Sequence, residues 1–513
     1  MTDRTAPLRP RLALLTILTL AATGCGGAVG PIREARGPSV ATGALTITPI
    51  TFAESEYWLI PVPRKLIPGP RKIAAEEGRL RVPVRYGDAD SDSIEIHFVR
   101  FRSTNPDPGP PIVYLAGGPG GSGTLASAGD RFDVFQALRA MGDVIALDQR
   151  GVYLTQPYLV CPDSWDHPLD QPTTVASLRE ASEPFRDACF AHWSDSVDVR
   201  AFNTRESAGD LDALRKVLGA EKLVLWGISY GTHLALAYIR QFPDHVAAAM
   251  LAGTEGPDHT YKLPANIDQV LLRVDSAMQA DPRIHAIAPN FLDELRTLLA
   301  RLDTAPERLS FVDRETKDSV HVIIGAHDLR RGVYSELGER EDIVRFPARI
   351  IPIVRGDLSE IAPLVARSRL GIRELAMTTA MDCASGAAPA RLALIDSQAA
   401  TALLRDAANV DIRSKCARWP AADLGDEFRE PVRSSAPVLF ISGTLDIKTP
   451  PSNAEEVRQG FPNSHHLIID GASHDDDLFL SSPLILETML AFLRGESGLR
   501  ERIVLKPLRF KRP

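Results

Sequence analysis

Residues 222–242 read KLVLWGISYGTHLALAYIRQF and carry a Gly-x-Ser-x-Gly motif between an apolar run and a helical pattern. The run KLVLWG is typical of a buried strand, and the residues after Ser229 have helical spacing. Gly227 and Gly231 leave room for a sharp turn, which would lift the Ser229 hydroxyl above a sheet at a helix N-terminus. A simple tight turn could carry the same motif, but the strand before it and the helix after it favour a nucleophilic serine.

Two later strand ends provide a base and an acid for such a serine. A serine hydroxyl is a weak nucleophile and needs an adjacent base that a carboxylate orients. Asp446 follows the apolar run 436–442, and His474 follows the run 465–470. Sites in α/β proteins form at the carboxyl ends of the strands. We therefore predict Ser229 as the nucleophile, His474 as the general base and Asp446 as the acid that orients it.

A glycine-rich loop, Gly117 to Gly123 (GGPGGSG), follows another apolar run, 111–116. Acyl transfer requires N–H donors aimed at the oxyanion that develops on the substrate carbonyl. We assign these donors to Gly118 in this loop and to Tyr230, directly after the serine. A phosphate-cradling loop is the alternative, but this loop lacks the lysine of the G-x-x-x-x-G-K-[ST] pattern.

Strand-like and helical patterns alternate in two stretches of the chain, with a mostly helical stretch between them. The alternation predicts an α/β fold with a mainly parallel sheet and right-handed crossovers. The runs 80–86 and 93–101 predict an N-terminal antiparallel hairpin. The helical stretch predicts an inserted cap. The predicted boundaries are a core in two parts, 51–256 and 432–498, a helical cap, 257–431, and a basic C-terminal tail, 499–513.

Residues 1–24 have the pattern of a secretory signal peptide. Three arginines precede the apolar run 12–22, which is too short to span a bilayer. Small residues then lead to Cys25, at the position where a bacterial lipoprotein carries its lipid; ordinary cleavage nearby is the alternative. Residues 25–50, rich in Gly, Ala, Pro and Thr, predict a flexible tether. The sequence thus favours a cell-envelope protein anchored through an acylated Cys25, or otherwise a secreted one.

Composition and cysteine content narrow the class of protein further. The chain has 513 residues and a formal net charge of −8, and this mildly acidic balance argues against a nucleic-acid-binding protein.

Four cysteines remain besides Cys25, and four allow three pairings. Export favours disulfides over four buried thiols, and we favour the pairs that close short local loops, Cys161–Cys189 and Cys383–Cys416. The sequence has no CxxC motif that would point to zinc.

Five motifs together resemble the α/β-hydrolase peptidases related to proline iminopeptidase, and more closely their exported tripeptidyl-aminopeptidase-like branch. The motifs are GGPGGSG (117–123), DQRG (148–151), GISYG (227–231), SGTLDIKTP (442–450) and GASH (471–474). The resemblance implies an α/β-hydrolase fold. It also implies a serine hydrolase that forms an acyl-enzyme and releases residues from peptide N-termini without a metal or cofactor.

Two positions bear on specificity within this resemblance. Proline iminopeptidases begin the glycine loop with His, whereas this chain has Ala116, which argues against narrow proline specificity. Such enzymes also bind the free amine of the substrate with acidic residues near the cap. Glu255, just beyond the run 245–253, is the candidate, and a hydrogen-bonded hinge residue at the cap junction is the alternative interpretation.

Two other functions compete with the aminopeptidase prediction. The same three residues would serve an esterase or lipase for small acyl esters, because a fold does not fix the substrate. A non-catalytic surface lipoprotein would use the fold for binding only, but such proteins usually lose a catalytic residue, and all three are present here. The expected partners are peptides or small acyl substrates, with a membrane reached only through Cys25. The oligomeric state stays open.

Overall fold

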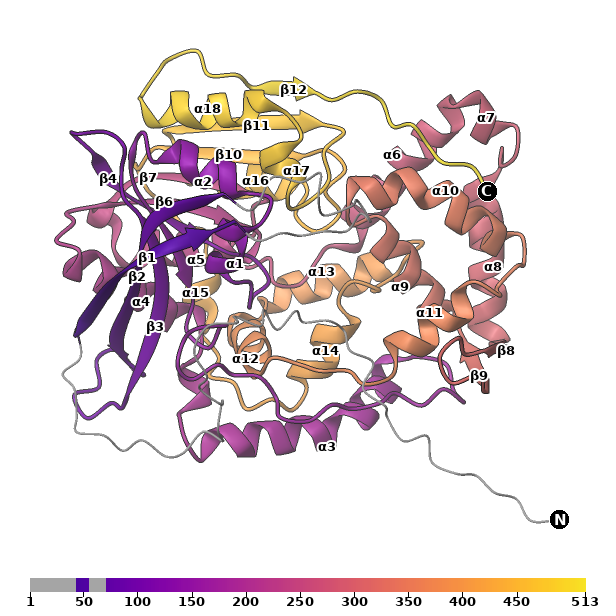
Figure 1. Ribbon diagram of the computed structural model, residues 1–513. Coiled ribbons are helices and arrows are strands. Elements are labelled where there is room, and N and C mark those ends of the chain that lie inside the picture. The colour runs from indigo at the N-terminus through magenta and orange to yellow at the C-terminus, as the bar shows by residue number, and fades with distance from the viewer. Residues whose placement is uncertain (1–42, 55–70) are drawn as a thin grey trace. The chain divides into compact units, whose positions relative to one another are not determined.

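The computed structural model describes residues 43–54 and 71–513 and contains a ten-stranded sheet, which lies to one side of the helical insertion (Figure 1). The strands are Leu45–Ala53 (β1), Lys72–Pro83 (β2), Ser93–Phe101 (β3), Gly109–Leu115 (β4), Gly142–Asp148 (β5), Leu223–Ile228 (β6), Val246–Ala252 (β7), Val438–Gly443 (β10), Ser464–Asp470 (β11) and Arg502–Val504 (β12). Their order is β1-β2-β3-β5-β4-β6-β7-β10-β11-β12. The pairs β1–β2, β2–β3 and β3–β5 are antiparallel, and all later pairs are parallel. The predicted α/β-hydrolase fold, with its N-terminal antiparallel hairpin, is therefore confirmed.

Helices occupy the segments between the strands and the long insertion after β7 (Figure 1). Those that follow or flank strands are Gly123–Ala128 (α1), Phe132–Leu138 (α2), Val175–Ser194 (α3), Thr204–Val217 (α4), Tyr230–Gln241 (α5), Pro451–Arg458 (α16), Asp477–Leu480 (α17) and Pro483–Leu493 (α18). The insertion contains Pro264–Ala280 (α6), Pro282–His285 (α7), Phe291–Thr304 (α8), Ala326–Glu336 (α9), Arg340–Val354 (α10), Ile361–Ser368 (α11), Ala376–Ser385 (α12), Pro389–Ala399 (α13), Val410–Cys416 (α14) and Asp426–Arg429 (α15). A two-stranded hairpin, Glu307–Val312 (β8) with Ser319–Ile324 (β9), completes it.

Both faces of the sheet are buried, and the strand sequences show why. Successive side chains of a strand point to opposite faces, so a strand covered on both sides is apolar throughout. In β6, Leu225 belongs to the apolar core shared with α4 and α5, whereas Trp226 belongs to the core shared with α2 and α18. Every residue of β6 and of β10 is buried. The strands that carry the candidate site are thus fixed on two sides.

The helical insertion has an apolar core of its own, which extends to the candidate site. Ile267, Phe291 and Phe346 from its helices are buried in this core. Leu445 and Ile447, on either side of Asp446, belong to the same core. Packing within the insertion therefore bears directly on the position of the predicted acid.

The first part of the predicted core also contributes to the helical layer. Val160 bridges to Leu375 and Trp165 bridges to Ile372, so the chain before α3 lies along the chain before α12. This contribution lies outside the predicted cap boundaries of 257–431.

Two predicted boundaries at the chain ends are wrong. The tether expected over residues 25–50 includes Leu45–Ile50, which belong to β1 and pair with β2 from Leu45↔Leu80 to Ala53↔Lys72. Threonine alternates there with β-branched apolar residues in LTITPITFA, and this local pattern favours a strand despite the Gly- and Ala-rich surroundings. The signal peptide and residues 25–42 of the tether, with Cys25, lie outside the described residues.

The predicted basic C-terminal tail over 499–513 is partly structured. β12 pairs in parallel with β11 and forms one edge of the sheet. Phe510 is 4% exposed and belongs to the core of the helical layer, and the Lys511 N–H donates to the Val344 carbonyl at 2.9 Å. Apolar residues among the basic ones account for this docking.

Two disulfides tie the helical layer together. Cys161–Cys189 links the segment before α3 to α3, and Cys383–Cys416 links α12 to α14. Both are the pairings favoured from the sequence. Among the helices of residues 43–54 and 71–513, none combines the length and apolarity that crossing a membrane requires.

Candidate active site

Ser229 occupies a sharp turn between β6 and α5. Its φ of +54° lies in the left-handed region, which residues with a side chain rarely adopt. The Ser229 N–H donates to the Ala252 carbonyl at the end of β7, at 3.0 Å, so the neighbouring strand holds the turn. The predicted strand–turn–helix arrangement is present.

The two glycines of the motif are required by close backbone approaches. An ideal Cβ on Gly231 would lie 1.9 Å from the Leu115 carbonyl oxygen, and one on Gly227 would lie 2.7 Å from the Gly231 carbonyl oxygen. Real Cβ atoms essentially never come within 3.0 Å of another heavy atom. Only glycine therefore lets α5 begin directly against the end of β4.

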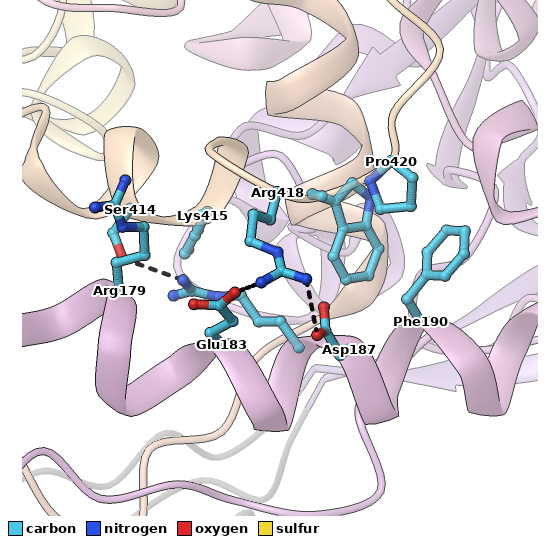
Figure 2. A pocket seen from close by; sticks show the side chains of 10 residues that line it. Arg179, Glu183, Asp187, Phe190, Ser414, Lys415, Arg418 and Pro420 are labelled. Atoms are coloured by element: carbon cyan, nitrogen blue, oxygen red, sulfur yellow. Dashed lines mark hydrogen bonds and ion pairs between the residues drawn. The ribbon is translucent and has the colours of Figure 1, made fainter. Parts of the chain in front are cut away.

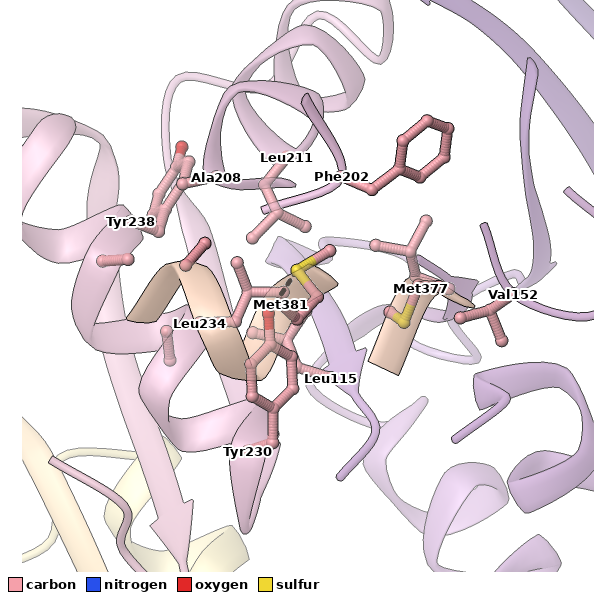
Figure 3. Close-up of a cluster of buried hydrophobic side chains, with 14 of the residues drawn as sticks. Leu115, Val152, Phe202, Ala208, Leu211, Tyr230, Leu234, Tyr238, Met377 and Met381 are labelled. Carbon is pink, nitrogen blue, oxygen red and sulfur yellow. Dashed lines mark hydrogen bonds between the residues drawn. The ribbon is translucent and has the colours of Figure 1, made fainter. Parts of the chain in front are cut away.

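Tyr230 anchors the turn in a buried apolar cluster, together with residues of α4, α5 and α12 (Figure 3). Its ring is 2% exposed, and its hydroxyl donates to the sulfur of Met381 at 3.1 Å and lies 2.9 Å from the Thr204 hydroxyl. The insertion, through α12, thus packs against the residue that follows the serine.

His474 and Asp446 meet beyond the carboxyl ends of β11 and β10. His474 Nδ1 lies 2.8 Å from Asp446 Oδ2, and both side chains are buried, at 5% and 0% exposure. Thr449 supports the pair, because its hydroxyl donates to Asp446 Oδ2 at 2.8 Å and its N–H donates to Oδ1 at 2.8 Å. The Lys448 N–H donates to Oδ1 as well, at 2.9 Å.

These contacts set the charge state of Asp446. Burial on its own raises the pKa of Asp446, but the charge and hydrogen bond of His474 and the donors of Thr449 outweigh it and lower the pKa below its usual range. Asp446 is therefore an ionised carboxylate at neutral pH, as orienting a histidine base requires.

Gly253, the residue after β7, lies between the serine turn and the histidine. An ideal Cβ on Gly253 would lie 3.2 Å from His474 Cε1, and the preceding residue, Ala252, accepts the Ser229 N–H. In the described part of the chain no hydrogen bond joins the Ser229 hydroxyl to His474. Catalytic hydrogen bonds are often long before substrate binds, so this geometry is compatible with a serine–histidine pair.

The glycine loop lies against the serine. An ideal Cβ on Gly117 would lie 3.0 Å from Ser229 Cβ and 3.7 Å from its Oγ. Gly118 has a φ of +119°, which favours glycine. Among the described backbone pairs, neither the Gly118 nor the Tyr230 N–H donates to a carbonyl, and Tyr230 begins α5, where N–H groups have no intrahelical acceptor. Neither N–H therefore has a described backbone acceptor, and their role as oxyanion donors stays a prediction.

Glu255 is buried near the start of the insertion but already has a cationic partner. Its Oε2 lies 2.6 Å from Lys262 Nζ, and its own N–H donates to the Thr232 hydroxyl at 2.7 Å. Burial raises the pKa of Glu255, but the charges of Lys262 and His233 outweigh it and lower the pKa below its usual range. The residue is both ionised and tied to the chain that leads into α6.

Asp382 of α12 is an acidic residue that sequence analysis did not single out. Burial raises its pKa to about 7, Lys415 lowers it and Glu255 raises it. Asp382 also acts electrostatically on Tyr230, so it lies near the serine turn. Its place in an ordinary helical segment far along the chain gave no motif that could have identified it.

The loop that carries His474 is held from two directions. Arg131, buried before α2, pairs with Asp475 and lies 2.7 Å from Asp476 Oδ1. Asp475 has a φ of +62°, and this strain directly follows the histidine. On the other side, the Ser473 hydroxyl accepts the Arg340 N–H at the start of α10, at 2.7 Å. The loop is therefore braced by both the sheet domain and the insertion.

Comparisons with known proteins agree with this architecture. The family model described as "alpha/beta hydrolase fold" matches residues 110–306, and the model described as "TAP-like protein" matches residues 404–497. The two matches contain the Ser229 turn and the Asp446 and His474 loops, respectively.

Three curated relatives have names of peptidases. "Serine protease Hip1" of Mycobacterium tuberculosis is 33% identical over 208 residues, covering 38% of each chain. "Tripeptidyl aminopeptidase" of Streptomyces lividans is 27% identical over 251 residues, covering 46% of this chain and 44% of the relative. "Proline iminopeptidase" of Neisseria meningitidis is 26% identical over 161 residues, covering 31% and 37%. The chain thus matches less than half the length of each of these relatives.

Proposed function

From the premise that the chain belongs to the α/β-hydrolase peptidases, we propose that it is a serine aminopeptidase that releases residues from peptide N-termini. The observation that carries the proposal is the pair formed by His474 and the buried, ionised Asp446, beside a serine held in a left-handed turn. A peptide substrate is favoured by the names of the relatives.

The proposed reaction begins with attack of Ser229 Oγ on the scissile carbonyl carbon. His474 Nε2 takes the serine proton, and Asp446 fixes the ring by accepting from Nδ1–H. The N–H groups of Gly118 and Tyr230 hold the oxyanion, and each lowers the activation barrier by about 3 kcal/mol. His474 then protonates the leaving amine, which departs and leaves an acyl-enzyme, and a water activated by His474 releases the acyl group.

Recognition of a free amine would fall to the acidic residues beside the serine turn. Glu255 and Asp382 interact electrostatically with each other and with Tyr230. Glu255 alone is already neutralised by Lys262, so we assign the substrate ammonium group to the pair rather than to Glu255 by itself.

The ion pair between Glu255 and Lys262 also favours a second candidate function. If the Lys262 ammonium stays paired with Glu255, the protein does not need a substrate that carries an ammonium group. This arrangement would suit a carboxylesterase that acts on small acyl esters. The same serine, histidine and aspartate would perform either reaction.

A substrate panel separates the two functions. It contains free-amine mono-, di- and tripeptide anilides, an N-acetylated tripeptide anilide and a short acyl ester, each with wild type and Ser229→Ala. Cleavage of the free-amine peptides alone, abolished in the variant, is expected. Cleavage of the ester alone would assign the chain to the esterases. Wild-type activity in a folded Ser229→Ala protein would refute Ser229 as the nucleophile.

We also propose that the protein is exported and anchored through an acylated Cys25. Two disulfides support an oxidising compartment, because cytosolic proteins rarely keep them. Metabolic labelling with a fatty acid tests the anchor: wild type should incorporate it and Cys25→Ser should not. Release of unlabelled wild type into the medium would point to ordinary secretion instead.

A further inference from the structure

A cleft in the helical layer lies between α3, α9, α11 and α14. It consists of two cavities of about 330 and 420 Å³, which adjoin because both are lined by Arg186, Ser414 and Lys415. Figure 2 shows the smaller cavity, with Ser414 and Lys415 toward one end and Phe190 and Pro420 toward the other. We call the two cavities together the cap cleft.

All the carboxylates that line the cap cleft already have cationic partners. Within it, Glu374 pairs with Arg186 at 2.8 Å, Asp328 with Arg369 at 2.7 Å and Asp411 with Arg331 at 2.7 Å. Glu336 pairs with Arg349, outside the lining, at 2.6 Å. In the smaller cavity Arg418 reaches both remaining carboxylates, Glu183 and Asp187 (Figure 2).

Three cations of the lining are left over. Arg179, Arg373 and Lys415 have no carboxylate within ion-pair distance among the described residues. Arg179 and Arg373 are exposed and Lys415 is partly buried, so all three reach solvent in the cleft. Because Arg418 faces two carboxylates, the lining as a whole holds seven Arg and Lys side chains against six carboxylates, and its surplus of positive charge lies at these three residues.

The cap cleft adjoins the candidate active site through α12. On one side of this helix, the Thr378 hydroxyl donates to the Pro119 carbonyl of the glycine loop at 2.9 Å. On the other side, the disulfide Cys383–Cys416 fixes α12 to α14, which carries Lys415. Asp382, next to this disulfide, interacts electrostatically with both Lys415 and Tyr230. α12 thus contacts both Tyr230, through Met381, and the helix that carries Lys415, through the disulfide.

We propose that the cap cleft binds a carboxylate group of the peptide substrate, which makes acidic peptides the preferred substrates of this chain. The inference rests on the proposed peptidase function for its biological meaning. The carboxylate belongs to a Glu or Asp side chain or to the C-terminus of the peptide, since both present the same group to a guanidinium or ammonium.

Two further features of the cleft suit a peptide. Trp165, Ile372 and Leu364 give it apolar walls between the charged groups, as peptide-binding clefts have. Asp382, the carboxyl group behind Lys415, does not fully cancel the lysine charge, because burial raises its pKa to about 7 and it is only partly ionised at neutral pH.

Binding of three pentapeptides to Ser229→Ala tests the proposal without turnover. The neutral peptide has a free N-terminal amine, glutamines near its C-terminus and an amidated C-terminus. The second peptide replaces one of these glutamines with Glu. The third keeps the neutral sequence but has a free C-terminal carboxylate. Calorimetry should give roughly tenfold tighter binding of at least one anionic peptide than of the neutral peptide. The difference should shrink at high ionic strength, and the peptide that gains affinity identifies the source of the carboxylate.

Variants of the leftover cations complete the test. In Ser229→Ala carrying Lys415→Met and Arg373→Met, the anionic preference should disappear while the neutral peptide binds as before. Lys222→Met, at an exposed lysine before β6, is the matched control and should leave the preference intact. If the double variant does not fold, Lys415→Gln alone should reduce the preference about threefold.

Equal binding of the neutral and anionic peptides would overturn the cleft proposal, whether or not peptides are hydrolysed. A variant that weakens all three peptides alike would overturn it too. Failure of wild type to hydrolyse any peptide would instead refute the proposed function, because the binding measurements use a protein that cannot turn over.

Discussion

Replacing Gly231 with alanine should displace the serine turn, although the substitution changes none of the proposed catalytic residues. The added Cβ would lie 1.9 Å from the Leu115 carbonyl oxygen, whereas ordinary contacts of a Cβ begin at 3.4 Å. The start of α5 must therefore move from the end of β4 by about 1.5 Å. Misplacement of reacting groups by about 1 Å costs on the order of 100-fold in rate. We expect at least that loss, together with about 1–3 kcal/mol of stability from overpacking.

The assay is the rate at which a fluorophosphonate labels Ser229, followed by the hydrolysis of the best substrate. Gly332→Ala is the matched control, because Gly332 lies inside the helix α9 and its added Cβ would meet only Ile361 Cδ1, at an ordinary 3.7 Å. Circular dichroism and thermal unfolding establish that both variants are folded. A folded Gly231→Ala protein that is labelled within about threefold of the control would refute the reasoning, since the steric argument would then not govern the position of the serine.

Three other predictions concern the acid, the buried carboxyl and a disulfide. Asp446→Asn should lower kcat about 10⁴-fold with little loss of structure, because the histidine base loses its orienting carboxylate. A loss of kcat below tenfold, measured on the best substrate, would contradict the assignment of Asp446 as the catalytic acid. Asp382 has a folded pKa raised to about 7, so the native state keeps a proton that the unfolded chain loses, and stability falls as pH rises from about 4 to 7. Asp382→Asn should remove this slope, at most about 1.4 kcal/mol per pH unit, in urea unfolding at several pH values; parallel curves for wild type and variant would disprove it. Replacing Cys383 and Cys416 with serine opens a 33-residue loop and should cost about 4 kcal/mol by the chain-entropy relation. Fluorophosphonate labelling of Ser229 should persist in that variant at low temperature, while the preference for acidic peptides declines. An unchanged midpoint of urea unfolding would contradict the expected loss of stability.

The parts of the site that could be predicted from the sequence lie next to buried strands. Ser229, Asp446 and His474 each follow a short apolar run, and the packing of a parallel sheet brings such strand ends together regardless of what is inserted between them. The sheet positions of the runs 80–86 and 93–101 could be predicted for the same local reason, since their pairing partner is the neighbour along the chain.

The parts that could not be predicted depend on contacts between distant segments. Asp382 and Lys415 come together only because α12 and α14 pack side by side, and neither helix carries a recognisable motif. The contribution of the chain before α3 to the helical layer was missed for the same reason. At the chain ends, composition was misleading: the Gly- and Ala-rich surroundings of β1 and the basic residues around β12 obscured short patterns that pair with the sheet.

The docked C-terminus has a genetic consequence. All proposed catalytic side chains precede residue 475, so a late stop codon would leave the chemistry encoded in full. Such a truncation would nevertheless remove β12 and Phe510, uncover the edge of β11 and open a gap in the core of the helical layer. An uncovered strand edge recruits other chains into aggregates. Nonsense and frameshift alleles between His474 and β12 should therefore behave as losses of the folded protein, although they lie outside the proposed catalytic residues.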